Sequence, residues 1–400
     1  MTDIKIQPIR MAHLLLTDEC NFRCVYCFHT KHPQKMTAQT ITRAIDWCLS
    51  ACGSNMHFEF FGGEPLLNWS VMQMGVQYSR MRAREVGKSV GFGVVTNASL
   101  LTMERATWCR ENNIGALLSY DGPYTNEATR GHTRDVEAGL HNALATDMRV
   151  SVAMQLPAGY TRHLYENFVA IEQMGFNTIA INPVTHCYDP YSEEDWRNID
   201  IGMRRIAEHQ YDRYVTGKGA TYSQLSNQIR TMQSITKMKD WTPHTRDASC
   251  GACKGSVAID ALGNIVPCQQ MPAGSGFDHY IMGNVNDGTY DQEVRQRVLE
   301  TRHVDMCREC PVVRCGSCRT INYWATGNEH EPCLESCLFQ LKMLDINKDL
   351  YNRLVVDDVI EGQLFKLYRP INEAIADLRN HYAALGLNAS GVAGQGDMDD

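Results

Sequence analysis

Cysteine is the residue type whose spacing in this chain points most directly to chemistry. The 400-residue sequence contains 16 cysteines, with three between Cys20 and Cys27 and nine between Cys250 and Cys337. Residues 1–10 alternate polar and apolar side chains and lack the apolar run of a secretion signal. Clustered cysteines in such a chain predict metal or iron–sulfur ligands rather than disulfides.

The N-terminal group reads Cys20-Asn-Phe-Arg-Cys24-Val-Tyr-Cys27. An iron–sulfur cube usually has four thiolate ligands, so three thiolates leave one iron open to bind another molecule. A short loop with this spacing can wrap three corners of a cube without help from the rest of the chain. A zinc knuckle or three reduced thiols is the alternative, and the companion motifs below make it the weaker interpretation.

This spacing resembles that of the radical S-adenosylmethionine enzymes. In that family the open iron binds S-adenosyl-L-methionine, and one electron from the cluster releases a 5′-deoxyadenosyl radical that takes a hydrogen atom from the substrate. The resemblance implies that Cys20, Cys24 and Cys27 hold one [4Fe-4S] cluster. It also implies that Tyr26 lies near the adenine, with ordinary loop packing as the alternative.

Two further motifs resemble those of the same family. Gly62-Gly63-Glu64-Pro65 matches a GGEP motif that contacts the amino group of the cofactor; its glycines permit close approach of the backbone, and its glutamate can accept hydrogen bonds from an ammonium. Alone, this segment would be read as a turn. Thr96-Asn97 matches a strand-end motif, although Ala98 replaces the usual glycine.

The remaining cofactor contacts rest on the resemblance alone. Ser119 would bind the ribose or the methionyl carboxylate, whereas Asp121, followed by glycine, is equally consistent with a simple turn. Two arginines lie near the position of the carboxylate-binding arginine of related enzymes, but neither aligns without a shift. The two arginines are Arg130 and Arg134. By the same resemblance, Asn182 would line the adenine site. Cys187 has two interpretations: it donates a hydrogen atom to a substrate radical, or it is a buried bystander thiol, which is the favoured interpretation.

The second group of cysteines resembles the SPASM domain, which carries auxiliary iron–sulfur clusters in enzymes that modify peptides and proteins. By the interleaved pattern of that domain, the first auxiliary cluster would be held by Cys250, Cys253, Cys268 and Cys318. The second would be held by Cys307, Cys310, Cys315 and either Cys333 or Cys337, with Cys333 preferred. A zinc-binding scaffold is the alternative.

Alternating strands and helices must position the first cysteine group. Hydrophobic patterns predict strands at 11–16, 57–61, 90–96, 116–119, 150–156 and 178–182, with helices between them. Thr161 is expected to cap a helix that runs to Met174. Six such units predict an α/β fold, a partial (β/α)6 TIM-like barrel with its chemistry at the C-terminal ends of the strands.

Four segments follow from these patterns. They are a radical S-adenosylmethionine partial barrel (1–188), a helical connector with a loop at 217–221 (189–246), a small cysteine-rich α+β SPASM domain (247–345), and C-terminal helices with a disordered tail (346–400). Within the cysteine-rich segment, 256–260 and 264–268 are expected to form a hairpin that turns at Gly263.

Composition limits the partners. The net charge of −8 gives no indication of a nucleic-acid-binding surface. No apolar run is long enough to cross a membrane. We expect a cytoplasmic protein. The resemblance implies a flavodoxin- or ferredoxin-like electron donor.

The favoured function is oxidative modification of a peptide or small-protein side chain, as in maturation of ribosomally made peptides, with an auxiliary cluster accepting the substrate's electron. In sulfatase-maturating relatives, an aspartate directly after the cysteine equivalent to Cys268 acts as the catalytic base. Here Gln269 and Gln270 follow Cys268, and an amide cannot deprotonate a substrate, which argues against sulfatase maturation. Few residues precede the first strand, so a separate leader-peptide-binding protein is one expected partner. The alternatives are a radical dehydrogenase acting on a sugar or cyclitol, and a non-catalytic iron–sulfur electron carrier.

Overall fold

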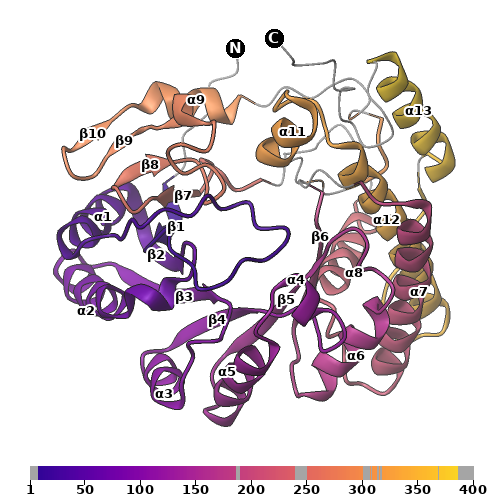
Figure 1. Ribbon diagram of the computed structural model, residues 1–400. Coiled ribbons are helices and arrows are strands. Elements are labelled where there is room, and N and C mark those ends of the chain that lie inside the picture. The colour runs from indigo at the N-terminus through magenta and orange to yellow at the C-terminus, as the bar shows by residue number, and fades with distance from the viewer. Residues whose placement is uncertain are drawn as a thin grey trace. The chain divides into compact units, whose positions relative to one another are not determined.

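The computed structural model describes residues 8–185, 190–238, 250–300, 307, 309–312, 315, 318–367 and 369–385. The chain forms two compact units (Figure 1). The first unit comprises Met1–Tyr120, Asn126–Val152 and Cys250–Thr301, and the second comprises Asp121–Thr125, Ala153–Ser249 and Arg302–Asp400. No helix within the described part of the chain is long and apolar enough to span a membrane.

Parallel strands form the centre of the first unit. Each pairs with the next in the order β1 (Ile9–Leu15), β2 (Cys52–Phe61), β3 (Ser89–Thr96) and β4 (Ile114–Ser119). The helices of this unit's βα repeats are α1 (Ala38–Ala51), α2 (Trp69–Glu85), α3 (Met103–Glu111), α4 (Asn126–Thr129) and α5 (Thr133–Ala145). With β5 (Val150–Leu156) and β6 (Ile179–Pro183), all six predicted strands are present, and the predicted partial (β/α)6 barrel is confirmed.

The two faces of β2 differ in chemistry. Phe58 and Phe60 are fully buried, and both stack near Phe92 of β3 at 6.2 Å between ring centroids. On the opposite face Glu59 pairs in register with a glycine of β3, whose absent side chain leaves room for the carboxylate. Also on that face is His13, which pairs in register with Glu59 and whose pKa is lowered by burial. The barrel side of the sheet is therefore partly polar, which the sequence analysis did not anticipate.

The predicted hairpin is present as β7 (Ser256–Ile259) and β8 (Asn264–Val266), which are antiparallel. Its turn contains Gly263 at a φ of +90°, and Asp260 accepts hydrogen bonds from the backbone there. β7 also pairs in parallel with β1. The strand order of this unit is thus β10-β9-β8-β7-β1-β2-β3-β4, where β9 is Gly283–Asn284 and β10 is Thr289–Tyr290. The hairpin extends the barrel sheet.

The second unit is mainly helical. Its helices are α6 (Leu164–Gln173), α7 (Glu193–Val215), α8 (Ser223–Ile235), α11 (Arg319–Thr326), α12 (Leu334–Val356) and α13 (Ile371–Ala384). The prediction that Thr161 caps α6 was wrong, because His163 occupies the N-cap position. The Thr161 hydroxyl instead donates to Asp195 Oδ1 of α7 at 2.8 Å. Asp195 also closes the capping box of α7 with Ser192.

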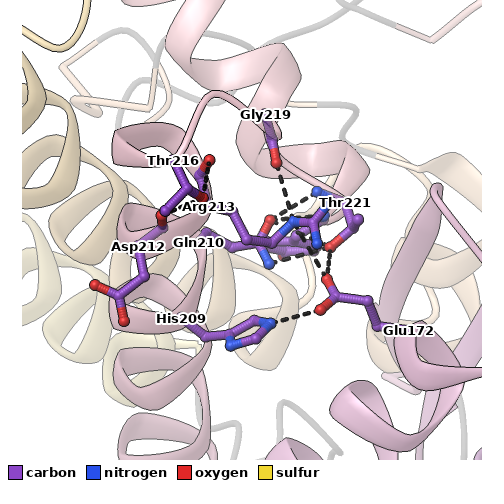
Figure 2. Close-up of polar contacts among 9 residues, drawn as sticks. Glu172, His209, Gln210, Asp212, Arg213, Thr216, Gly219 and Thr221 are labelled. Carbon is purple, nitrogen blue, oxygen red and sulfur yellow. Dashed lines mark hydrogen bonds and ion pairs between the residues drawn. The ribbon is translucent and has the colours of Figure 1, made fainter.

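A polar network fixes the predicted loop between α7 and α8 (Figure 2). Glu172 of α6 receives a hydrogen bond from Thr221 and contacts His209 Nε2 at 2.6 Å. Gln210, which is fully buried, accepts from the Thr221 backbone N–H at 2.7 Å. Burial opposes ionisation of Glu172, but these hydrogen bonds and the charge of Arg213 hold its pKa below the usual value. The loop is therefore attached to both α6 and α7.

Candidate cofactor site

The cysteine loop begins directly after β1 and is attached at its base. Thr17 is buried, and its hydroxyl donates to the Gln34 carbonyl at 2.9 Å and accepts from the Glu19 N–H at 3.0 Å. Cys20 and Cys24 are partly buried, whereas Cys27 is exposed. Burial raises the pKa of the Cys20 thiol, and the nearby Glu64 and Cys27 raise it further. The loop thus holds its three thiols beside the GGEP segment.

The glycines of the GGEP segment allow two stretches of backbone to meet. A Cβ on Gly62 would lie 2.3 Å from the Thr17 carbonyl oxygen, and one on Gly63 would lie 2.2 Å from that of Glu19. The Gly63 N–H donates to the Thr17 carbonyl and the Glu64 N–H to that of Glu19, both at 2.8 Å. These glycines are thus required by the cysteine loop itself, whatever the backbone approaches on its other side.

Glu64 joins the end of β2 to the end of β3. Its side chain is completely buried; Oε1 accepts from Leu66 N–H at 3.0 Å and Thr96 Oγ1 at 2.7 Å, and Oε2 accepts from Asn97 N–H at 2.8 Å. Burial raises the pKa of Glu64, while these three hydrogen bonds oppose that rise. Pro65 then begins a short 3-10 helix. Contact between Glu64 and a cofactor ammonium stays a prediction.

Asn97 connects the end of β3 to the cysteine loop. Its Nδ2 donates to Asn21 Oδ1 at 2.9 Å, and its Oδ1 accepts from the backbone and hydroxyl of Ser99. Asn21 Nδ2 donates to Ser99 Oγ at 2.9 Å, which closes the network. Ala98 has a φ of +65°, a conformation that costs an alanine about 1 kcal/mol. Glycine, which the resembling motif has at this position, would adopt the same conformation without that cost.

The structure distinguishes the two candidate arginines. Arg130 is buried and its guanidinium lies 5.3 Å from the centre of the Tyr26 ring. The Val25 N–H donates to the carbonyl of Thr129 at 2.9 Å, so this segment is bound to the cysteine loop. Arg134 is exposed on α5. Of the two, Arg130 is the better candidate for a cofactor carboxylate.

Other predicted contacts are distributed between the units. Ser119 is partly exposed at the end of β4 in the first unit. Asp121, in the second unit, is buried and accepts from the Gln155 N–H of β5 at 2.9 Å, which attaches this segment to that strand. Asn182 lies in β6, where its Oδ1 is 3.5 Å from Gln224 Nε2. Cys187 lies outside the described residues.

The cysteines predicted for the first auxiliary cluster also belong to both units. Cys250, Cys253 and Cys268 lie in the first unit and Cys318 in the second. Cys253 is fully buried with a φ of +59°, and its carbonyl accepts two hydrogen bonds from Arg295 at 3.0 and 2.9 Å. A buried arginine of α9 (Gln292–Leu299) therefore holds the backbone of this cysteine in place.

The cysteines predicted for the second auxiliary cluster gather within the second unit. Cys307, Cys310 and Cys337 line one pocket. Burial raises the pKa of Cys337 well above its usual value, and the neighbouring thiols of Cys315, Cys307, Cys310 and Cys333 raise it further. Cys333 is buried and its thiol donates to the Thr185 carbonyl at 3.5 Å. This arrangement favours Cys337 as the fourth ligand, whereas the sequence analysis preferred Cys333. The choice between the two stays a prediction.

A pocket of the first unit flanks the cysteine loop and was not predicted. Its empty volume is about 500 Å³, open to solvent, and its lining includes Asp18, His29, His32, Asp260 and Gln270. Burial and the charge of Asp260 raise the pKa of Asp18 to about 6. The sequence signal was its position two residues before Cys20. The pocket thus presents a carboxyl group, two imidazoles and an amide.

The donors present suit iron–sulfur clusters. In the described ranges no three cysteine, histidine or carboxylate side chains converge on a point that would hold a single metal ion. The thiolates of a cube bind different irons, so they need not converge on one point. Thiol donors on a short loop, with a buried arginine and polar strand ends beside them, fit a cluster and a charged organic cofactor.

Comparisons with known proteins agree with this reading. Residues 9–134 match the family model of a 4Fe-4S single cluster domain. The radical SAM cyclopropyl synthase TigE of Paramaledivibacter caminithermalis is 26% identical over 306 residues, which are 70% of this chain and 60% of that protein. The chain thus spans less than two thirds of that relative's length.

Two solved structures share the fold. Native anSMEcpe with bound AdoMet and Cp18Cys peptide superposes with a TM-score of 0.69 at 14% identity, covering 88% of this chain and 99% of that chain. Streptococcus suis SuiB bound to the precursor peptide SuiA gives a TM-score of 0.52 at 14% identity, covering 82% and 75%.

Proposed function

We propose that the chain is a radical S-adenosylmethionine enzyme and that it oxidatively modifies a side chain of a peptide or small protein. The peptides bound to the two structural neighbours support a peptide substrate. The observation that carries the proposal is the construction of the first unit. Its cysteine loop is bonded to the GGEP backbone, to Asn97 and to the segment before Arg130, and a polar pocket flanks the same loop.

The cofactors define the chemistry and the chain positions them. When bound, the cluster and S-adenosyl-L-methionine supply a 5′-deoxyadenosyl radical, which takes a hydrogen atom from the substrate. Cys20, Cys24 and Cys27 would hold that cluster. Arg130 would pair with the carboxylate of the cofactor, because a guanidinium suits that group, and Tyr26 would pack near its adenine.

The electron count requires an acceptor. Reductive cleavage of S-adenosyl-L-methionine consumes one electron, and hydrogen-atom transfer leaves an unpaired electron on the substrate. A crosslink, thioether or double bond then forms with loss of one proton and one electron. We assign the acceptor of that electron to auxiliary [4Fe-4S] clusters on the C-terminal cysteines, which gives three clusters in all. The electron returns to the protein, so the substrate undergoes a net two-electron oxidation.

Iron content and cofactor cleavage test this function together. Protein purified without oxygen and reconstituted should contain about twelve irons per chain, falling to about eight in the Cys20→Ala/Cys24→Ala/Cys27→Ala variant. The variant should release no 5′-deoxyadenosine from S-adenosyl-L-methionine. Candidate peptides should then lose about two mass units for each modification with wild-type protein only. About four irons together with bound zinc would contradict the electron-acceptor role, and oxidised sugars with unchanged peptides would contradict the substrate class.

A further inference from the structure

One face of α13 covers the cysteine pocket of the second unit. Its buried residues are Ala374, Leu378 and Tyr382, which are spaced four apart and lie on one face of the helix. Ala374 and Leu378 line the pocket together with Cys307, Cys310 and Cys337. Tyr382 therefore lies one turn further along the face that the cysteines contact.

The hydroxyl of Tyr382 is buried and lacks a hydrogen-bond partner within the part of the chain that the structure describes. The side chain is only 2% exposed. A buried hydroxyl without a partner is destabilising, so such a group usually has a partner in the working protein. Burial raises the pKa of Tyr382, and the charges of Cys337, Cys333, Glu331 and Cys307 raise it further.

The other polar groups beside this pocket already have partners. His381, the preceding residue, contacts Glu331 Oε1 at 2.7 Å. Arg369 lines the pocket and donates to Asp377, with Glu309 and Glu373 each at 3.8 Å. The cationic group near the cysteines is thus already paired with carboxylates. An iron–sulfur cluster bound here would bring sulfur atoms that accept hydrogen bonds.

We propose that Tyr382 donates a hydrogen bond to a sulfur of the auxiliary cluster held by Cys307, Cys310, Cys315 and Cys337. The inference rests on the proposed ligation of a cluster in this unit. Such a bond strengthens as the cluster gains negative charge, so it stabilises the reduced form and raises the reduction potential. Tyr382 is a positioning residue that sets how readily this cluster takes the substrate's electron.

Replacement of Tyr382 by phenylalanine removes the hydroxyl and keeps the ring. In anaerobically reconstituted protein, the ratio of reduced to oxidised second auxiliary cluster at a fixed potential should fall about 2- to 10-fold, the effect of losing one hydrogen bond. Iron content should stay at about twelve. Potentiometric titration followed by electron paramagnetic resonance measures the ratio. Tyr351→Phe is the matched control, because that hydroxyl already donates to the Gln363 carbonyl at 3.0 Å, and its cluster potential should not change.

A second measurement needs no stable variant. Wild-type protein exchanged into deuterated water should show a strongly coupled exchangeable proton at the reduced second auxiliary cluster by electron–nuclear double resonance. An unchanged potential in Tyr382→Phe with full iron content, or no exchangeable proton in wild type, would overturn the Tyr382 assignment alone. Absence of the cluster itself would overturn both this inference and the proposed cluster content.

Discussion

Glu64 offers a direct test of how the GGEP segment is built. Its buried carboxylate accepts three hydrogen bonds, two of them from the backbone N–H groups of Leu66 and Asn97. Glu64→Gln keeps the shape but exchanges one acceptor oxygen for an NH2 group. In the amide orientation that loses fewer hydrogen bonds, the amide oxygen still accepts from Leu66 N–H and Thr96 Oγ1, and the NH2 group faces the Asn97 N–H.

The cost follows from that single mismatch. A buried donor left without an acceptor costs about 1–3 kcal/mol, so local opening at the end of β3 should increase about 5- to 150-fold. Hydrogen–deuterium exchange of peptides covering Leu66 and Asn97 measures this directly. The two amides should differ: Asn97 should exchange much faster in the variant, and Leu66 only slightly faster.

The control is Glu85→Gln, because Glu85 is half exposed and pairs with Arg82 at the surface of α2. A surface ion pair contributes about 0–1 kcal/mol, so exchange at Asn97 should not change in this variant. Wild-type exchange at Asn97 in Glu64→Gln would refute the reasoning. It would mean that Glu64 is already protonated in the folded protein, or that the Asn97 N–H has another acceptor.

Three further predictions concern other parts of the chain. Gly139→Ala should lower the free energy of unfolding by about 1–3 kcal/mol in urea titrations, because the new Cβ would lie 2.0 Å from the Ala98 carbonyl oxygen. Burial lowers the pKa of His13 below its usual 6.5, so its contribution to stability is present above pH 6.5 and lost as the pH falls. Urea midpoints at about pH 7.5 and 5.5 should therefore differ less in His13→Gln than in wild type. Cys337→Ser should remove about four irons, whereas Cys333→Ser should keep all of them in an iron assay.

Each of these has a control or a contrary outcome. Gly75→Ala is the control for Gly139→Ala. Its new Cβ would crowd the flexible Ile41 side chain rather than backbone, so the loss of unfolding free energy should be smaller. Equal losses of unfolding free energy in Gly139→Ala and Gly75→Ala would show that contact with the backbone is not the cause of the destabilisation. An unchanged pH dependence in His13→Gln would assign the effect to another group. Iron loss in Cys333→Ser alone would restore that residue as the cluster ligand.

The barrel strands could be predicted because their patterns are local. Runs of buried residues such as Phe58 and Phe60, bounded by turns, identified β2, and the motif glycines marked its end. The conformation of Ala98 was beyond such patterns, because nothing in the residue type announces a positive φ. The capping assignment of Thr161 failed because its hydroxyl bonds to α7 instead, donating to Asp195 and accepting from Asn198 Nδ2, and both partners are distant in the sequence.

Long-range pairings explain what else was missed in the candidate site. The pocket at Asp18 exists because Asp260, in the hairpin turn, and Gln270, after the hairpin, fold back onto the loop before Cys20. The sequence analysis preferred Cys333 as the last cluster ligand, and that choice stays a prediction; the fold of α12 brings Cys337 into the pocket that Cys307 and Cys310 line. Neither juxtaposition is encoded in local spacing.

The parallel pairing of β7 with β1 has a consequence for how the protein is made. β1 ends at Leu15, and its partner begins about 240 residues later at Ser256. At about 5–20 residues per second, the ribosome needs about 12–48 s to deliver that partner. During this interval one edge of β1 has no strand beside it, and unpaired edges invite aggregation. Slow synthesis or scarce chaperones should therefore harm the yield of this protein before any iron is inserted.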